Sequence, residues 1–228
     1  MRTQRHRRHF PICGLLLLLL LLLAAFAAYL YFNEMALNTS KQDPSAWNLT
    51  LVNGSNPLPE DWDVELTELA NGECVDSRIY PELQAMFDTA RDEGVYPMVA
   101  SGYRSEAEQV RIMEEYIQEY LDQGYSQEEA EAEARNWVAE PGTSEHQLGL
   151  AVDINADGVN STGYEVYDWL EEHCWEYGFI RRYPEDKTAI TGVSNEPWHY
   201  RYVGVDAARE ITEQGLCLEE YIENIREK

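Results

Sequence analysis

The chain has 228 residues, enough for one medium-sized domain with additional segments, and its 44% hydrophobic content is ordinary for a globular protein. Its formal net charge is −25; all 42 acidic residues follow position 33, whereas four of the 17 basic residues precede it. Nucleic acid and anionic lipid are therefore unsuitable partners, because this acidic surface would repel them. We interpret the charge as a solubilising surface.

Residues 12–32 form a nearly continuous apolar run, preceded by a basic cytoplasmic leader at residues 1–11. About 20 apolar residues match the thickness of a bilayer, and the arginines of the leader favour the cytoplasmic side. A cleavable signal peptide is the alternative, since Ala25-Phe26-Ala27 fits a cleavage pattern, but the run exceeds the usual length. We expect a single-pass anchor in the cell membrane, with the rest of the chain extracytoplasmic.

Residues 33–56 are polar and lack sustained periodicity, which predicts a spacer between the membrane and a domain at residues 57–228. In an oxidising compartment we expect a bridge between Cys174 and Cys217, although Cys74 leaves the number of thiols odd and sequence cannot assign connectivity. The sequence does not specify an oligomer, and a monomer is expected.

The domain begins with a predicted helix followed by a strand. Residues 80–93 carry apolar side chains at helical spacing, and the short apolar run 97–100 predicts the strand. Ser105 then caps a second helix, with Val110 on its apolar face and Gly124 at its end.

An acidic helix is predicted next. Ser126 and Glu129 have the spacing of a capping box, and Pro141-Gly142 ends the helical stretch 128–139. We expect its glutamates to form a solvated face.

Three strands and three helices complete the predicted elements, at residues 150–154, 179–182 and 198–203 and at residues 165–177, 206–214 and 218–226, respectively. Helices and strands are mixed without regular βαβ repetition, and no internal repeat is present. This order predicts an α+β fold with a small antiparallel sheet flanked by helices.

Three possible metal ligands occur on two of these strands or shortly before one of them. His146 lies seven positions before Asp153, which alternation places on the polar face of the strand 150–154. The strand 198–203 likewise separates His199 from its aromatic neighbours. Two histidines and one carboxylate are a standard set of ligands for catalytic zinc, with a fourth position open to water.

A general base for such a site is available nearby. Glu196 precedes His199 by three residues in Glu-Pro-Trp-His, and we expect a rigid proline turn to hold its carboxylate near the metal. The remaining histidines are poorer ligands: His6 and His9 belong to the leader, and His173 lies mid-helix among glutamates.

Calcium binding is a competing interpretation of one segment. Residues 153–158 follow the opening of an EF-hand loop, but the twelfth position is Tyr164 rather than glutamate. Because Asp153 has a better use as a zinc ligand, we expect residues 155–158 to form an Asx-rich turn.

Four stretches resemble the VanY-type D-alanyl-D-alanine carboxypeptidases, zinc enzymes of bacterial cell-wall metabolism. They occur in family order, cover most of residues 57–204, and read SGYRSEAEQ, PGTSEHQLGLAVDI, YGFIRRYP and EPWHYRYVG. The pattern Ser-x-His-x-x-Gly-x-Ala-x-Asp, joined to Glu-x-Trp-His, is highly specific.

This resemblance implies one zinc ion held by His146, Asp153 and His199, with Glu196 as the base that later protonates the leaving amine. Arg104 looks like the family arginine beside the metal, where a guanidinium can bind the substrate carboxylate or the oxyanion.

Gln109 and Ser144 look like the substrate-contacting residues of the family. Without the resemblance, the sequence indicates only a glutamine on a helix face and a serine in a loop. Arg181, Arg182 and the acidic stretch 128–135 depart from the family pattern. We expect these departures to lie away from the metal ligands and to bear on substrate choice.

The implied reaction is hydrolysis of the last peptide bond of a peptidoglycan stem by zinc-bound water, which releases D-alanine. Three alternatives stay open, because the active-site residues hardly distinguish these activities: an L,D-carboxypeptidase of tetrapeptide stems, a D,D-dipeptidase and an endopeptidase. A membrane anchor favours wall substrates over a free cytoplasmic dipeptide. A non-catalytic wall-binding module is disfavoured. A structural zinc site has four protein ligands and needs no general base, whereas this sequence offers three ligands and Glu196 as a base.

Overall fold

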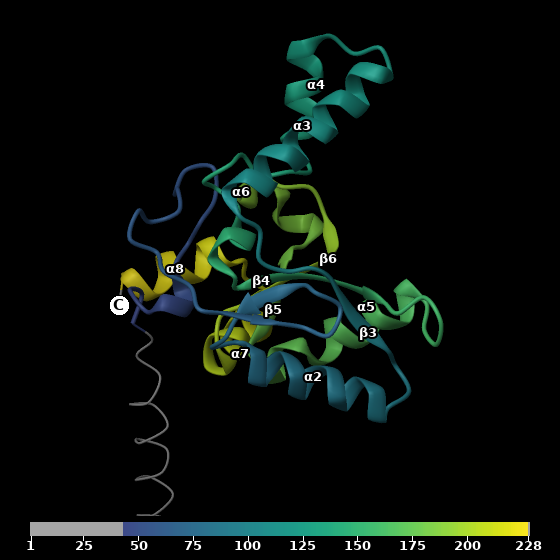
Figure 1. Ribbon diagram of the computed structural model, residues 1–228. Helices are drawn as coiled ribbons and strands as arrows, with labels where there is room; N and C mark the ends of the chain where they lie inside the picture. The colour runs from purple at the N-terminus through teal and green to yellow at the C-terminus, as the bar shows by residue number, and fades with distance from the viewer. Residues whose placement is uncertain (1–42, 228) are drawn as a thin grey trace, which may run out of the picture. The chain divides into compact units, whose positions relative to one another are not determined.

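The computed structural model describes residues 43–227. Within this range the fold is built on a four-stranded antiparallel sheet (Figure 1). Its four strands lie in the order β3 (Pro97–Ser101), β4 (Ala151–Ala156), β6 (Glu196–Tyr202) and β5 (Phe179–Tyr183). A separate two-stranded ribbon pairs β1 (Leu66–Glu68) with β2 (Cys74–Asp76). Every neighbouring pair is antiparallel, which confirms the predicted α+β class.

Helices surround this sheet. The described α-helices are α2 (Tyr80–Asp92), α3 (Glu106–Asp122), α4 (Gln127–Ala134), α5 (Gly163–His173), α6 (Thr188–Thr191), α7 (Val205–Gln214) and α8 (Leu218–Arg226). Short 3₁₀ turns are η1 (Trp47–Leu49), η2 (Glu145–Leu148), η3 (Cys174–Tyr177) and η4 (Glu185–Lys187). Ser105 caps α3 and Ser126 forms a capping box at the start of α4, as predicted; Ser105 also forms a capping box, with Glu108, that was not predicted. Figure 1 shows α3 and α4 together as an arm that projects from the sheet.

The main core lies between one face of the sheet and helices α2 and α5. Leu83 and Met86 of α2 pack there with Val152 and Ile154 of β4 and Leu170 of α5, all at most 2% exposed. Each such side chain contributes about 1.5–3 kcal/mol on burial. Since alternate residues of a strand point to opposite faces, the other face of β4 and β6 is left for polar side chains.

The folded region begins before the predicted boundary at Pro57. Leu49 and Val52, assigned to a polar spacer, are buried in the described structure, and the Asn48 side chain donates a hydrogen bond to the Val203 carbonyl. The boundary is wrong because these few apolar residues fill gaps between distant elements without forming a periodic pattern.

The predicted leader, the membrane segment 12–32 and the rest of the spacer lie outside the described residues. Within residues 43–227, none of the helices combines the length and apolar character that a membrane crossing needs.

Two helices of the arm differ from their predicted form. Val110, predicted on the apolar face of α3, is 38% exposed, whereas Met113, predicted on the same face, is buried, and Gln109 is buried as well. Helix α4 ends at Ala134, not at residue 139, because the backbone N–H groups of Asn136 and Trp137 bond three residues back and tighten the chain into turns. Val138 lies beyond this end in a small core of the arm with Met113 and Ala134. Similarly, α5 ends at His173 and continues only as η3.

The predicted bridge between Cys174 and Cys217 is absent: both thiols are free, as is Cys74. Cys174 packs in the main core, whereas Cys217 stands at the N-cap of α8. Burial raises the pKa of the Cys174 thiol to about 12 and that of Cys217 to about 11.

Candidate active site

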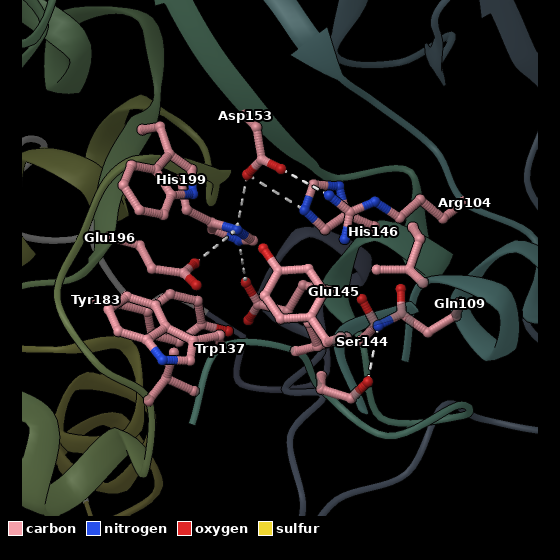
Figure 2. A pocket seen from close by; sticks show the side chains of 16 residues that line it. Arg104, Gln109, Trp137, Ser144, Glu145, His146, Asp153, Tyr183, Glu196 and His199 are labelled. Atoms are coloured by element: carbon pink, nitrogen blue, oxygen red, sulfur yellow. Dashed lines mark hydrogen bonds and ion pairs between the residues drawn. The ribbon is translucent and has the colours of Figure 1, made fainter. Parts of the chain in front are cut away.

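Asp153 of β4 and His199 of β6 are directly paired across the two strands, so their side chains share the polar face of the sheet. Nδ1 of His199 lies 3.2 Å from Oδ1 of Asp153, and Nε2 of His146, from η2, lies 3.4 Å from the same oxygen (Figure 2). The three predicted ligands therefore converge, with their ligand atoms all within 4.8 Å of one another.

This arrangement fits a metal ion. Zinc bonds of 2.0–2.2 Å in a tetrahedron place neighbouring ligand atoms about 3.3 Å apart, which matches both separations at Asp153. Oδ1 of Asp153 is buried and accepts no hydrogen bond from any described residue, although a buried carboxylate oxygen normally has a partner. Three protein ligands leave the fourth tetrahedral position open for chemistry.

His146 is oriented by the backbone. Its Nδ1 donates to the Gly102 carbonyl over 2.7 Å, which leaves the Nε2 lone pair facing the other ligands. A Cβ at position 102 would lie 2.1 Å from the Cys74 carbonyl oxygen, so only glycine allows this approach. Burial lowers the pKa of His146, which favours the neutral form that a metal needs.

Arg104 lies in the site, as predicted, and contacts a ligand directly. Its Nη2 donates to Oδ2 of Asp153 over 2.7 Å, and its Nε donates to Ser101 Oγ over 2.9 Å. Burial alone would raise the pKa of Asp153, but the neighbouring His146 and His199 hold it well below its usual range. Asp153 is thus ionised and oriented by the arginine.

Glu196 also takes its predicted place. Its Oε2 lies 3.6 Å from Nδ1 of His199, and the side chain is buried. Burial is the main cause that raises the pKa of Glu196 to about 7, so the carboxyl can gain and lose a proton near neutral pH. Pro197 lies within β6 and does not form the predicted turn.

Glu145 is a component that the sequence analysis missed. Its side chain is fully buried and accepts from Arg182 Nε over 2.8 Å and from Arg201 Nη1 over 3.0 Å. Burial would raise the pKa of Glu145, but these two arginines hold it well below its ordinary value. Arg182 and Arg201 lie within predicted strands, and two arginines in strands were the available signal that a buried carboxylate had to be nearby.

The other carboxylate oxygen of Glu145 lies 3.6 Å from Nε2 of His199. The expectation that Arg182 lies away from the metal ligands was therefore wrong in one respect, since Glu145 connects it to His199. Burial would lower the pKa of His199, but without a metal the adjacent Asp153 and Glu145 raise it to about 9.

The ligands lie in a cavity of about 110 Å³. Gln109 and Ser144 line it, as predicted, and both are buried. Nε2 of Gln109 donates to the Ala139 carbonyl over 2.7 Å, whereas its buried Oε1 accepts no hydrogen bond from the described residues. Oε1 of Gln109 is therefore available to accept a hydrogen bond from a bound ligand.

Two large aromatic side chains from the arm also line the cavity. Tyr116 of α3 and Trp137, which follows α4, are 38% and 41% exposed. Neither residue is predictable as part of the site from the sequence, because each reads as an ordinary helix residue. Trp198 lines the cavity as well; it precedes His199, the first residue of β6 that pairs with β4.

The Asx-rich turn predicted at residues 155–158 begins later than expected, because Asn155 and Ala156 belong to β4 and only Asp157 and Gly158 lie in the turn. Oδ1 of Asp157 accepts from the backbone nitrogens of Val159 and Asn160 over 3.0 and 2.8 Å. These bonds lower the pKa of Asp157 to about 2.

Comparison with known proteins identifies similar chains. The family model VanY, D-alanyl-D-alanine carboxypeptidase, matches residues 72–205. A D-alanyl-D-alanine carboxypeptidase of Enterococcus faecalis is 62% identical over 190 residues, which cover 83% of this chain and 71% of the relative.

Two solved structures are 64% identical to the chain and cover 78% of it. One is a vancomycin-resistance D,D-pentapeptidase VanY in complex with Zn(II), with a TM-score of 0.76 and 99% of its length covered. The other is VanYB in complex with D-alanine-D-alanine, with a TM-score of 0.77 and 98% covered.

Proposed function

Because the chain belongs to the VanY family of D-alanyl-D-alanine carboxypeptidases, we propose that it is a zinc peptidase that removes the terminal D-alanine from peptidoglycan stem peptides. The observation that carries the proposal is the convergence of three ligand atoms, the unpartnered Oδ1 of Asp153 and one nitrogen each of His146 and His199, with the buried carboxyl of Glu196 beside them. Relatives that bind Zn(II) and D-alanine-D-alanine support it.

His146, Asp153 and His199 would hold the ion through Nε2, Oδ1 and Nδ1. Zinc in such a site lowers the pKa of water from 15.7 to about 7 and polarises a carbonyl group. Gly102 and Arg104 keep two of these ligands in place, so that their lone pairs meet at one point.

Glu196 carries the proton. Hydrolysis requires that one proton leave the attacking water and that one reach the amine of the departing D-alanine. Oε2 of Glu196 takes the first and returns it to the amine, and a pKa of about 7 suits both steps near neutral pH.

Arg104 and Gln109 bind the substrate in this proposal. Arg104 commits Nε and Nη2 to Ser101 and Asp153, so Nη1 is the nitrogen that pairs with the substrate carboxylate or the oxyanion. The free Oε1 of Gln109 accepts an N–H of the peptide, and Ser144 offers a hydroxyl from the same wall.

In this proposal the rest of the stem peptide extends out of the cavity along the arm formed by α3 and α4. The cavity is too small for more than the end of a pentapeptide, and Tyr116 and Trp137 are the exposed aromatic side chains along its lining. They provide an apolar surface for the part of the stem beyond the scissile bond.

Location is part of the proposal. The apolar run 12–32 behind four arginines supports a single membrane pass with the catalytic domain outside the cytoplasm. Protease treatment of intact cells tests this: degradation of the domain supports it, and protection in intact but not lysed cells contradicts it.

Product analysis by mass spectrometry tests the reaction. The zinc-loaded full-length chain is incubated separately with pentapeptide and tetrapeptide stems, beside a Glu196→Gln control and a chelator-treated sample. Loss of one alanine from the pentapeptide alone, absent in both controls, is expected. Cleavage of only the tetrapeptide would indicate an L,D-carboxypeptidase, and cleavage of neither would indicate a binding module.

A further inference from the structure

The carboxylate of Glu145 lies behind His199, on the side away from the other ligands. Oε2 of Glu145 is 3.6 Å from Nε2 of His199, whereas Nδ1 of the same ring faces Asp153 (Figure 2). Both Oε2 and Nε2 are buried, and neither has a hydrogen-bond partner among the described residues. Each atom is therefore the natural partner of the other, just beyond hydrogen-bond distance.

A histidine that binds a metal through one nitrogen carries its proton on the other, and the partner of that second nitrogen fixes the ring. His146 has such a partner in the Gly102 carbonyl. We propose that Glu145 is the positioning residue for His199, accepting its Nε2 proton so that the Nδ1 lone pair faces the metal. This inference rests on the zinc site of the proposed function.

Glu145 is itself held rigidly. Its Oε1 accepts from Nε of Arg182 over 2.8 Å and from Nη1 of Arg201 over 3.0 Å, and both arginine side chains are fully buried. Because Oε1 satisfies the two guanidinium groups, Oε2 remains directed at His199.

The arginines connect Glu145 to both ends of the described chain. Arg182 forms a second, two-bonded ion pair with Glu219 of α8, over 2.8 and 2.6 Å. Nη2 of Arg201 donates to the carbonyls of Asn48 and Thr50. The N-terminal segment at η1 and the last helix therefore brace the side chain that orients His199.

A purely structural role for this ionic cluster is the competing explanation, and the cluster contains its own control. Glu145 and Glu219 are both carboxylates on Arg182, but only Glu145 contacts His199. Removing either charge disturbs the buried ion pairs. Only removal of the Glu145 charge should disturb the metal site.

The test compares zinc affinity of the full-length wild type, Glu145→Gln and Glu219→Gln by competition with a chromophoric chelator. In the Glu145→Gln variant the amide oxygen satisfies the arginines and its NH₂ donates to Nε2, which favours the wrong tautomer of His199. We expect zinc affinity to fall about 10–100-fold, with an altered absorption spectrum of the cobalt(II)-substituted protein. The Glu219→Gln variant should lose thermal stability but keep wild-type zinc affinity. Equal zinc affinities in the two variants would overturn the proposal, whereas a wild type that binds no zinc would instead overturn the proposed function.

A measurement on the wild type covers the case in which Glu145→Gln does not fold. Nitrogen NMR of the zinc-loaded chain should show His199 protonated at Nε2 and bonded to the metal through Nδ1. The opposite assignment would show that Glu145 does not set the tautomer.

Discussion

Glu196 and His199, three residues apart on β6, approach to 3.6 Å between Oε2 and Nδ1. In a regular strand such residues point to opposite faces. Here the register between β5 and β6 changes. Arg181 pairs with Tyr200 and Tyr183 pairs with Glu196, so two positions on β5 correspond to four positions on β6. A bulge in β6 thus re-aims Glu196 toward the metal ligands.

Replacing Glu196 by glutamine should lower kcat about 10²–10⁴-fold, because the variant keeps the shape of the side chain but cannot carry the proton. Glu196 is not among the three proposed ligands, so zinc content measured by atomic absorption should equal that of the wild type. Loss of zinc together with activity would mean that Glu196 binds the metal.

Trp137→Ala should lower kcat/KM for a pentapeptide stem about 3- to 10-fold, since one aromatic contact contributes about 0.5–1.5 kcal/mol. In the proposed binding mode the dipeptide D-alanine-D-alanine ends before this surface, so binding of the dipeptide, measured by calorimetry, should not change. Tyr125→Ala is the matched control: Tyr125 lies on the same arm and is 41% exposed, as is Trp137, but does not line the cavity. Equal losses on both substrates would show that Trp137 acts on the catalytic centre instead.

The turn at Asp157 should open in acid. The backbone N–H of Asn160, followed by that of Val159, lowers the pKa of this carboxyl to about 2, below its unfolded value of about 3.9. A lowered pKa stabilises the folded turn above pH 4, and that stabilisation disappears as pH falls through about 2. Hydrogen exchange of these two amides, compared at several pH values with Asp157→Ala, measures it. Protection that is independent of Asp157 would contradict the prediction.

The native thiols of Cys174 and Cys217 should react slowly with an alkylating reagent at pH 8, because burial raises their pKa values to about 12 and 11. Denaturation without reductant should expose both thiols to rapid alkylation, visible by peptide mass mapping. A mass loss of two hydrogens shared by these peptides would reveal the bridge that the structure lacks.

Local sequence patterns predicted most elements because those patterns act over a few residues. The capping box at Ser126, for example, needs only a serine and a glutamate three positions on. Predictions failed where a distant contact decided the outcome. The stretch after Ala134 turns into the small core of the arm, where Val138 lies with Met113, and Leu49 and Val52 enter cores formed by much later segments.

The sequence by itself determined which side chains can bind the metal: Asp153 and His199 at strand positions of fixed alternation, His146 seven residues before Asp153, and a glutamate close by. Tertiary structure decided what surrounds them. Glu145 reads as a loop residue and Arg182 as a family departure, yet pairing of β5 with β6 and packing of α8 bring them together behind His199. Buried charges require partners, and a linear sequence does not state which distant charge will be the partner.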